Sequence, residues 1–279
     1  MNHFDDATNR QFRRVKMEKP KMQATVSEHE RGFIFNMVHE DGRRESALLP
    51  KVDQESALSK SVANLIARSG DFAGTVEVAD SQYLPGARAE HLRASVANVF
   101  AKAFQSAQKD AQGEMQKIAT ARAVAMEVPP ASATTASQRA RQLVLWDRAT
   151  LPEKGAMLAD PNLPFEGLAS LIESGAYKEV PAELQKVATD RWIVEAHIRR
   201  AGLAPDFAKV PDMHDPIATG PDMDAARAYA QRSANELNAR SQTVAIMADT
   251  LRAMVKIVAL ATDLSGEKAF RLLETGSAA

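Results

Sequence analysis

The segment DMDAARAYAQRSANELNARSQTVAIMADTLRAMVKIVALAT, residues 222–262, sets the fold class of this chain. Two companion series of residues recur in it every seven positions: Ala230, Leu237, Val244, Leu251 and Val258, and Ser233, Arg240, Met247, Met254 and Ala261. Such a heptad pattern predicts one long α-helix with a seam along it, more polar in the first half and strongly apolar in the second.

A second long helix is expected upstream, between Pro85-Gly86 and Pro129-Pro130. Its apolar stripe comprises Leu92, Val96, Val99, Phe100, Ala103, Phe104, Ala107, Ala111, Met115, Ile118 and Ala125. Several of these residues recur close to every eleven positions, as in Val96, Ala107 and Ile118. This period corresponds to about 3.67 residues per turn and therefore predicts a nearly straight helix.

From the two long helices we expect an elongated, mainly α fold. Each would contain roughly 40 residues and measure about 60 Å at 1.5 Å per residue. A compact globule of this chain length has a diameter of only about 50 Å. We therefore expect an elongated molecule, or helices that extend into a neighbouring subunit.

The composition agrees with a helical protein and excludes several classes. The chain has 279 residues, of which 50 are alanine, the residue with the highest helix propensity, and none is cysteine. Without thiols there is no disulfide scaffold, cysteine-ligated zinc site, iron–sulfur cluster or cysteine hydrolase. The 35 basic and 36 acidic residues nearly cancel, which argues against a polyanion-binding surface over the whole molecule.

The sequence predicts neither a membrane span nor a secretory signal. No stretch approaches 18 consecutive apolar residues, so no membrane span is predicted. The N-terminal sequence has no apolar segment of the kind that a secretory signal needs. We expect cytoplasmic synthesis, with later incorporation into a virion left open.

Residues 24–84 are predicted to form a small α+β unit. A hairpin is expected over 31–49, because the Asp41-Gly42 pair favours a tight turn between two strand-like segments. A helix is expected over 53–69, ending at Gly70. The segment Gly74-Thr75-Val76-Glu77-Val78-Ala79 predicts a third strand.

Prolines, glycines and capping residues divide the rest of the chain into segments. Residues 1–23 are interpreted as a basic arm, 85–202 as the long helix followed by helical hairpins, 203–221 as a proline-rich strap, and 222–279 as the heptad helix with a C-terminal turn. Shorter helices are expected at about 137–149, from Leu151 after a Thr150–Glu153 capping box, at 164–174 and at 181–201.

A search for chemistry finds no motif that assigns an activity. The chain has no P-loop, dinucleotide-binding, nucleophile-elbow or HExxH motif. Asp212, His214 and Asp215 are ligand types for a divalent ion, but a polar loop between prolines explains them better. Helix capping likewise explains Asp222 and Asp224. We therefore predict no catalytic, cofactor or metal site.

Two sets of residues are candidates for binding. The first is the basic run of the arm, made of Arg10, Arg13, Arg14, Lys16, Lys19 and Lys21. It suits an acidic protein surface or nucleic-acid phosphates, and a solvated tail is the plainer interpretation. The second is the apolar seam of the last helix, made of Leu237, Val244, Met247, Leu251, Met254 and Val258. It suits an interface between helices of different copies, or a core stripe within one chain.

These features favour a structural or assembly protein that acts by shape and subunit contacts, with other protein subunits as partners in a homo- or hetero-oligomer. The concrete expectation is a component of a bacteriophage particle, such as a neck, tail or internal protein. One alternative is a protein that associates with nucleic acid, non-specifically, through its arm. The other is an enzyme whose site is assembled from residues distant in the sequence.

Overall fold

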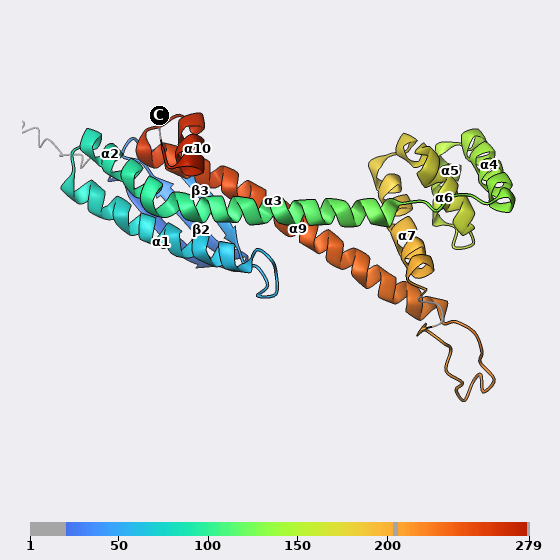
Figure 1. Ribbon diagram of the computed structural model, residues 1–279. Helices are drawn as coiled ribbons and strands as arrows, with labels where there is room; N and C mark the ends of the chain where they lie inside the picture. The colour runs from blue at the N-terminus through green and yellow to red at the C-terminus, as the bar shows by residue number, and fades with distance from the viewer. Residues whose placement is uncertain (1–20, 203–205, 278–279) are drawn as a thin grey trace, which may run out of the picture. The chain divides into compact units, whose positions relative to one another are not determined.

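The computed structural model describes residues 21–202 and 206–277 and confirms a mainly helical chain with a small sheet near its N-terminus (Figure 1). The strands are β1 (Gln23–His29), β2 (Gly32–Val38) and β3 (Arg44–Pro50). The helices of the first part are α1 (Ser59–Gln82), α2 (Pro85–Ser95), the π-helical turn η1 (Val96–Phe100) and α3 (Ala101–Met126). Those that follow are α4 (Ala133–Arg148), α5 (Leu151–Ala159), α6 (Phe165–Ser174), the 3-10 turn η2 (Ala176–Glu179), α7 (Ala182–Ala201), α9 (Met223–Thr262) and α10 (Gly266–Thr275).

The chain divides into two compact units. The first holds the described residues up to Asp110 and from Met247 onward, and the second holds Ala111–Ile246. The division falls within α3 and within α9, so each of these helices contributes to both units. With 40 residues, α9 is about 60 Å long, which confirms the long final helix. The elongated shape of the molecule stays a prediction.

The first unit is built on an antiparallel sheet in the order β1-β2-β3. The expected hairpin is confirmed, with Val38 paired to Arg44 and Gly42 in the left-handed region at φ +89°. Its partner strand β1 was not expected: it lies at the start of the predicted α+β unit, before the hairpin, where no strand was assigned. Ala24 and Val26 pair with Met37 and Phe35 of β2, so their alternation follows the buried face of the sheet.

The third strand expected at 74–79 is wrong, because these residues belong to α1. The buried positions of α1 include Val62, Leu65, Ser69, Phe72, Val76 and Ala79, a helical spacing of three and four residues. The helix passes through Gly70 instead of ending there. Burial of this continuous face outweighs the strand preference of Val76 and Val78, and Val78 is left half exposed.

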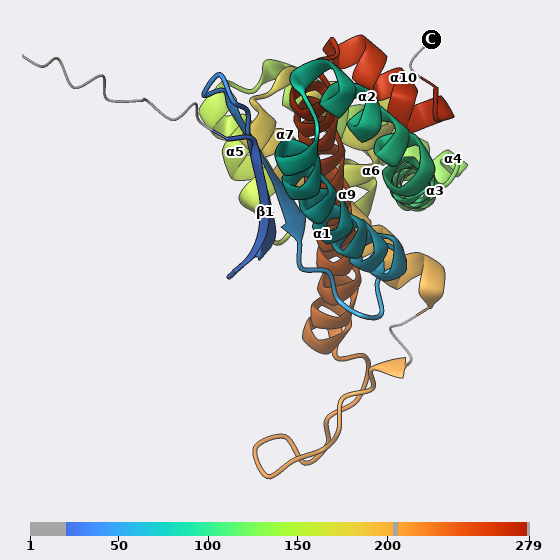
Figure 2. The same cartoon turned by 90° about the vertical axis from the view of Figure 1, so that its left-hand side faces the viewer.

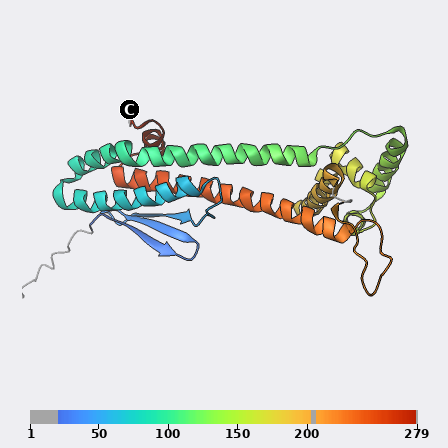
Figure 3. The same ribbon diagram turned by 60° about the horizontal axis from the view of Figure 1, so that its bottom comes forward.

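Aromatic rings connect the layers of the first unit. Phe35 of the sheet meets Phe72 of α1 edge to face, with ring centroids 6.4 Å apart. Phe72 in turn stacks on Phe100 of η1 at 5.6 Å. Figure 3 shows the sheet below α1, with the C-terminal half of α9 beside that helix. The hydroxyl of Thr250 on α9 donates to the carbonyl oxygen of Leu48, which links α9 directly to β3.

The π-helical turn η1 changes the expected apolar stripe. The backbone N–H of Ala101 donates to the carbonyl oxygen of Val96, a five-residue step in place of the usual four. Phe100 is fully buried, whereas Val99, which the stripe also included, is 38% exposed. Met115 of the same stripe is exposed as well. The other stripe residues up to Ile118 are buried, so most of the predicted face is confirmed.

The second unit has a core around the two tryptophans of the chain. Trp146 of α4 and Trp192 of α7 are both fully buried, in one cluster with apolar residues of α5 and α6. The capping box that starts α5 is confirmed, since the backbone N–H of Thr150 donates to Glu153 at 2.7 Å. Gly175 and Gly202 end α6 and α7 in the left-handed region.

The proline-rich segment before α9 doubles back on itself, which places its two ends together. Ala208 and Pro221 form an isolated β-bridge, and the N–H of Lys209 donates to the carbonyl oxygen of Gly220 at 2.9 Å. Figure 2 shows the resulting loop, which leaves and returns at the start of α9. Residues 209–220 are called the bridged loop below.

Candidate binding site

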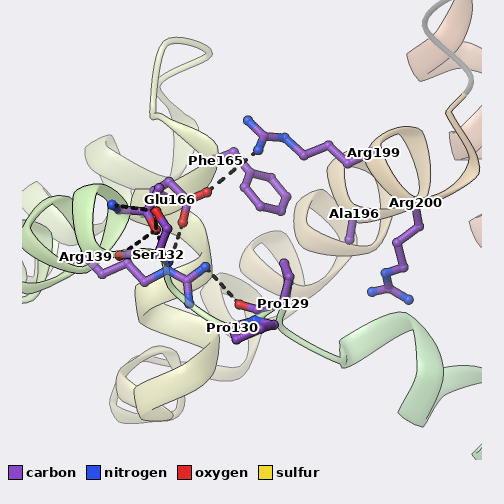
Figure 4. A pocket seen from close by; sticks show the side chains of 10 residues that line it. Pro129, Pro130, Ser132, Arg139, Phe165, Glu166, Ala196, Arg199 and Arg200 are labelled. Atoms are coloured by element: carbon purple, nitrogen blue, oxygen red, sulfur yellow. Dashed lines mark hydrogen bonds and ion pairs between the residues drawn. The ribbon is translucent and has the colours of Figure 1, made fainter.

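A pocket of about 250 Å³ lies within the second unit, where α4, α6 and α7 meet the segment after α3 (Figure 4). Its walls are formed by Pro129, Pro130, Ser132, Thr135, Arg139, Phe165, Glu166, Ala196, Arg199 and Arg200. Three of these ten residues are arginines and one is a glutamate, so the lining is positively charged. The three arginines have different partners, and the differences define what the pocket can do.

Arg139 of α4 is buried and fully engaged by the protein. Its Nε donates to Glu166 at 2.8 Å, its Nη1 to Glu173 at 2.9 Å and its Nη2 to the carbonyl oxygen of Pro129 at 3.0 Å. Burial alone would lower the pKa of the guanidinium, but the hydrogen bonds and charges of both glutamates outweigh it and raise this pKa. Arg139 therefore stays charged and fixes α6 and the Pro129 turn to α4.

Arg200, near the end of α7, caps another helix. Its guanidinium donates to the carbonyl oxygens of Val124, of Ala125 at 2.8 Å and of Glu127 at 3.0 Å. These carbonyls lie in the last turn of α3 and directly after it, where a helix runs out of backbone donors for its carbonyl oxygens. A positive charge at this end also interacts favourably with the helix dipole.

Arg199 is held differently. Its guanidinium carbon lies 3.9 Å from the centroid of the Phe165 ring, and its Nη1 lies 3.7 Å from Glu166 Oε1. Phe165 is itself fixed, because its ring stacks on that of Trp192 with centroids 5.0 Å apart. Within residues 21–202 and 206–277, the N–H groups of Arg199 form no hydrogen bond, and its side chain is 59% exposed. Its donors are thus oriented by stacking and available to a ligand.

Capping of one helix by a side chain of another recurs in both units. In the second unit, Arg191 donates to four carbonyl oxygens at the end of α5 and just after it: Leu158, Asp160, Pro161 and Leu163. In the first unit, Arg93 donates to Thr262, the last residue of α9, and Gln105 donates to Leu273 and Glu274 of α10. Nothing in the sequence signals these pairs, because the partner is a backbone carbonyl far along the chain.

The basic arm lies mainly outside the described residues: Arg10, Arg13, Arg14, Lys16 and Lys19 are not among them. Lys21 is exposed and lines a hollow between β1 and α1, together with Glu77 and Asp80. Whether the arm binds phosphate or protein stays a prediction.

The heptad seam contributes unequally to the surface. Val244, Met247, Met254 and Val258 are buried by the chain itself, whereas Leu237 and Leu251 are half-buried. Of the six seam residues, all described, only Leu237 and Leu251 are exposed enough to contact another copy of the chain.

The acidic residues that resembled metal ligands serve the backbone. Asp212 Oδ1 accepts the N–H groups of His214 and Asp215, both at 2.7 Å, which closes a turn. Asp222 Oδ1 accepts those of Asp224 and Ala225 and so caps α9. In the part of the chain that is described, no cluster of three or more histidine and acidic residues has metal-binding geometry. No described helix is both long and apolar enough to cross a membrane.

Comparison of the chain with protein-family models, curated proteins and solved structures gives no match. The chemistry of the pocket is therefore assigned from its side chains alone. A guanidinium offers a planar pair of donors to a carboxylate or phosphate, and the Phe165 ring with the two prolines offers apolar surface beside it. This combination suits the binding of an anionic group attached to an apolar one.

Proposed function

We propose that this protein is a structural or assembly protein that acts through subunit contacts, and that it serves as a component of a bacteriophage particle. The observation that carries the proposal is the bridged loop, 209–220. It presents apolar side chains to solvent from a base that the protein closes firmly. The content of 50 alanines and no cysteine supports the particle component only as a compositional resemblance.

The base of the bridged loop is anchored to the second unit. The N–H of Asp222 donates to the carbonyl oxygen of Phe207, next to the Ala208–Pro221 bridge. The Phe207 ring lies 5.7 Å from that of Tyr229, on the first turns of α9. Because both ends are held, the loop is presented from a defined position on the unit.

Three large apolar side chains of the bridged loop are almost fully exposed to solvent. Val210 is 82% exposed, Met213 87% and Ile217 83%. Burial of apolar surface contributes about 25 cal/mol per Å², so covering these side chains with a partner would contribute several kcal/mol in gross terms. A partner that covers exposed apolar side chains removes them from water, which is how protein interaction sites use such residues.

The test is the mass of the protein in solution, measured by light scattering and native mass spectrometry. We expect a defined oligomer or hetero-complex for the wild-type chain, and the 30.3 kDa monomer for a variant carrying Val210→Ser, Met213→Ser and Ile217→Ser. A matched control carries Val144→Ser and Leu145→Ser, two half-exposed apolar residues on α4. It should keep the wild-type mass.

A wild-type chain that stays a monodisperse monomer, and that is missing from purified particles of its source, would overturn the proposal. A loop variant that assembles like the wild type would show that the bridged loop is not the contact.

A further inference from the structure

In the arginine pocket of the second unit, the guanidinium of Arg199 lies over Phe165 and donates no hydrogen bond within residues 21–202 and 206–277. Arg139 donates hydrogen bonds to two glutamates and a carbonyl oxygen, and Arg200 donates to carbonyl oxygens at the end of α3. Among the described residues, Arg199 has only the face of Phe165 and a long ion pair of 3.7 Å to Glu166. Figure 4 shows its guanidinium extending over the ring, away from Arg200.

Stacking prepares Arg199 for a planar anion. The Phe165 ring has Trp192 as a second stacking partner, and Trp192 is fully buried, so the ring provides a fixed platform. A guanidinium held over an aromatic ring loses less side-chain freedom when it binds, and its paired N–H groups match the two oxygens of a carboxylate.

The size of the pocket limits what enters it. Its volume of about 250 Å³ is below the range of about 300–1,000 Å³ that is typical of sites for free small molecules. It has room for one residue of a peptide. Pro129, Pro130, Phe165 and Ala196 supply an apolar wall for the carbon part of that residue.

The charge around Arg199 favours a singly charged group. Glu166 Oε1 lies beside the guanidinium, and its partner Oε2 is already bound to Arg139. A phosphate with nearly two negative charges is repelled by this carboxylate more strongly than a carboxylate ligand is. A single open guanidinium also lacks the several donors that phosphate sites usually combine.

We propose that this pocket binds the carboxylate of a peptide segment from a partner protein, with Arg199 as the ligand-contacting residue and Phe165 as its positioning residue. Arg139 and Arg200 keep their own partners and contribute positive potential. The carboxylate belongs either to an acidic side chain or to the end of a chain. The inference rests on the proposed function in one respect, namely that the partner is a protein.

The test measures binding of three short peptides to the full chain by NMR titration, observing the arginine Nε–Hε signals. One peptide ends in a free leucine carboxylate, the second has an internal glutamate and an amidated end, and the third has glutamine and an amidated end. We expect the first, the second or both to bind, to shift the Arg199 signal, and to bind at least tenfold more weakly to Arg199→Gln. The glutamine peptide should not bind.

Two variants separate this proposal from a general effect of charge. Arg232 also lies over an aromatic ring, 5.7 Å from the centroid of Tyr229, but does not line the pocket, so Arg232→Gln should leave binding unchanged. Glu166→Gln removes the neighbouring negative charge and keeps an oxygen for Arg139, so it should strengthen peptide binding severalfold. A thermal melt of each variant verifies its folding.

The proposal is overturned if neither carboxylate peptide binds, if Arg199→Gln and Arg232→Gln behave alike, or if inorganic phosphate binds more tightly than the peptides. None of these outcomes bears on the mass measurement with the bridged-loop variant. Failure of the pocket and failure of the assembly proposal are therefore distinguishable.

Discussion

His39 Nε2 lies 3.3 Å from Asp263 Oδ1, which brings the turn between β2 and β3 against the residue that follows α9. On its other side, His39 Nδ1 lies 3.0 Å from Asp41. The imidazole is thus buried between two carboxylates that belong to distant parts of the chain. Asp263 has a left-handed backbone, at φ +53°, which asparagine and glycine also tolerate.

Replacement of His39 by alanine should destabilise the first unit. The change leaves a cavity and removes the group that bridges Asp41 and Asp263, so we expect a loss of about 1–3 kcal/mol in the free energy of unfolding. Urea denaturation measures it. The control is His214→Ala, on the exposed bridged loop, which should change stability by less than about 0.5 kcal/mol. Equal effects of the two substitutions would contradict the bridging role of His39.

Acid should weaken the β2–β3 turn through Asp41. The backbone N–H of Arg43, helped by the side chains of Arg43 and His39, lowers the pKa of Asp41 to about 2. Because the pKa of Asp41 is lower in the folded state than the unfolded value of about 3.9, the charged carboxylate stabilises the fold above that pH. This stabilisation is lost as the pH falls toward 2. The stability difference between wild type and Asp41→Asn should therefore shrink from pH 5 to pH 2. A difference that stays constant over this range would exclude the linkage.

Removal of Arg88 should be among the most damaging single changes in the first unit. Arg88 is buried and pairs with Asp80 at 2.7 Å and with Glu40 at 2.8 Å. Loss of one partner of a buried ion pair leaves an uncompensated charge, at a cost of about 3–5 kcal/mol. We expect this loss for Arg88→Met, measured by urea denaturation. The double variant Arg88→Met with Asp80→Asn should recover part of it, and no recovery would argue against the ion pair as the cause.

Replacement of Arg200 by methionine should loosen the end of α3. The carbonyl oxygens of Ala125 and Glu127 lose their donor, so amide hydrogen exchange should become faster in the last turn of α3. The expected loss of stability is about 1–2 kcal/mol. Arg141→Met, on the exposed face of α4, is the matched control and should leave exchange in α3 unchanged. Unchanged exchange in Arg200→Met as well would refute the cap.

The basic arm gives the nucleic-acid alternative a direct test. If the arm binds phosphates, the affinity for duplex DNA should fall steeply with salt, with a log–log slope of about −0.9 per phosphate contacted. Binding should disappear when Arg10, Arg13, Arg14 and Lys16 become alanine. Fluorescence anisotropy at several salt concentrations measures both. Binding that is absent, or that salt does not change, removes this alternative.

The long helices could be predicted because their signal is local. The eleven-residue spacing and Pro129-Pro130 place the C-terminal end of α3 within a few residues, and the heptad spacing over 222–262 does the same for both ends of α9. The error at 74–79 has the opposite origin. The pattern Val76-Glu77-Val78 is locally typical of a strand, and only burial against the sheet makes it helical.

The candidate pocket could not be predicted in the same way. Its charged members come from three helices, and each is an ordinary residue in its own segment: Arg139, Glu166, Arg199 and Arg200. Their meeting depends on how α4, α6 and α7 pack around Trp146 and Trp192. The stacking of Arg199 on Phe165 depends on the same packing. A chain whose chemistry is distributed over packed helices leaves no compact motif in its sequence.

The π-helical turn η1 also bears on the gene that encodes this chain. A π-turn holds one residue more than an α-helical turn, so a continuous helix from Pro85 to Met126 would need one residue fewer. Deletion of the codon for exposed Asn98 would restore regular α-helical spacing while Leu92 and Phe104 kept their buried positions. An in-frame loss of one codon, which ordinarily rotates everything downstream in a helix, should be tolerated at this position.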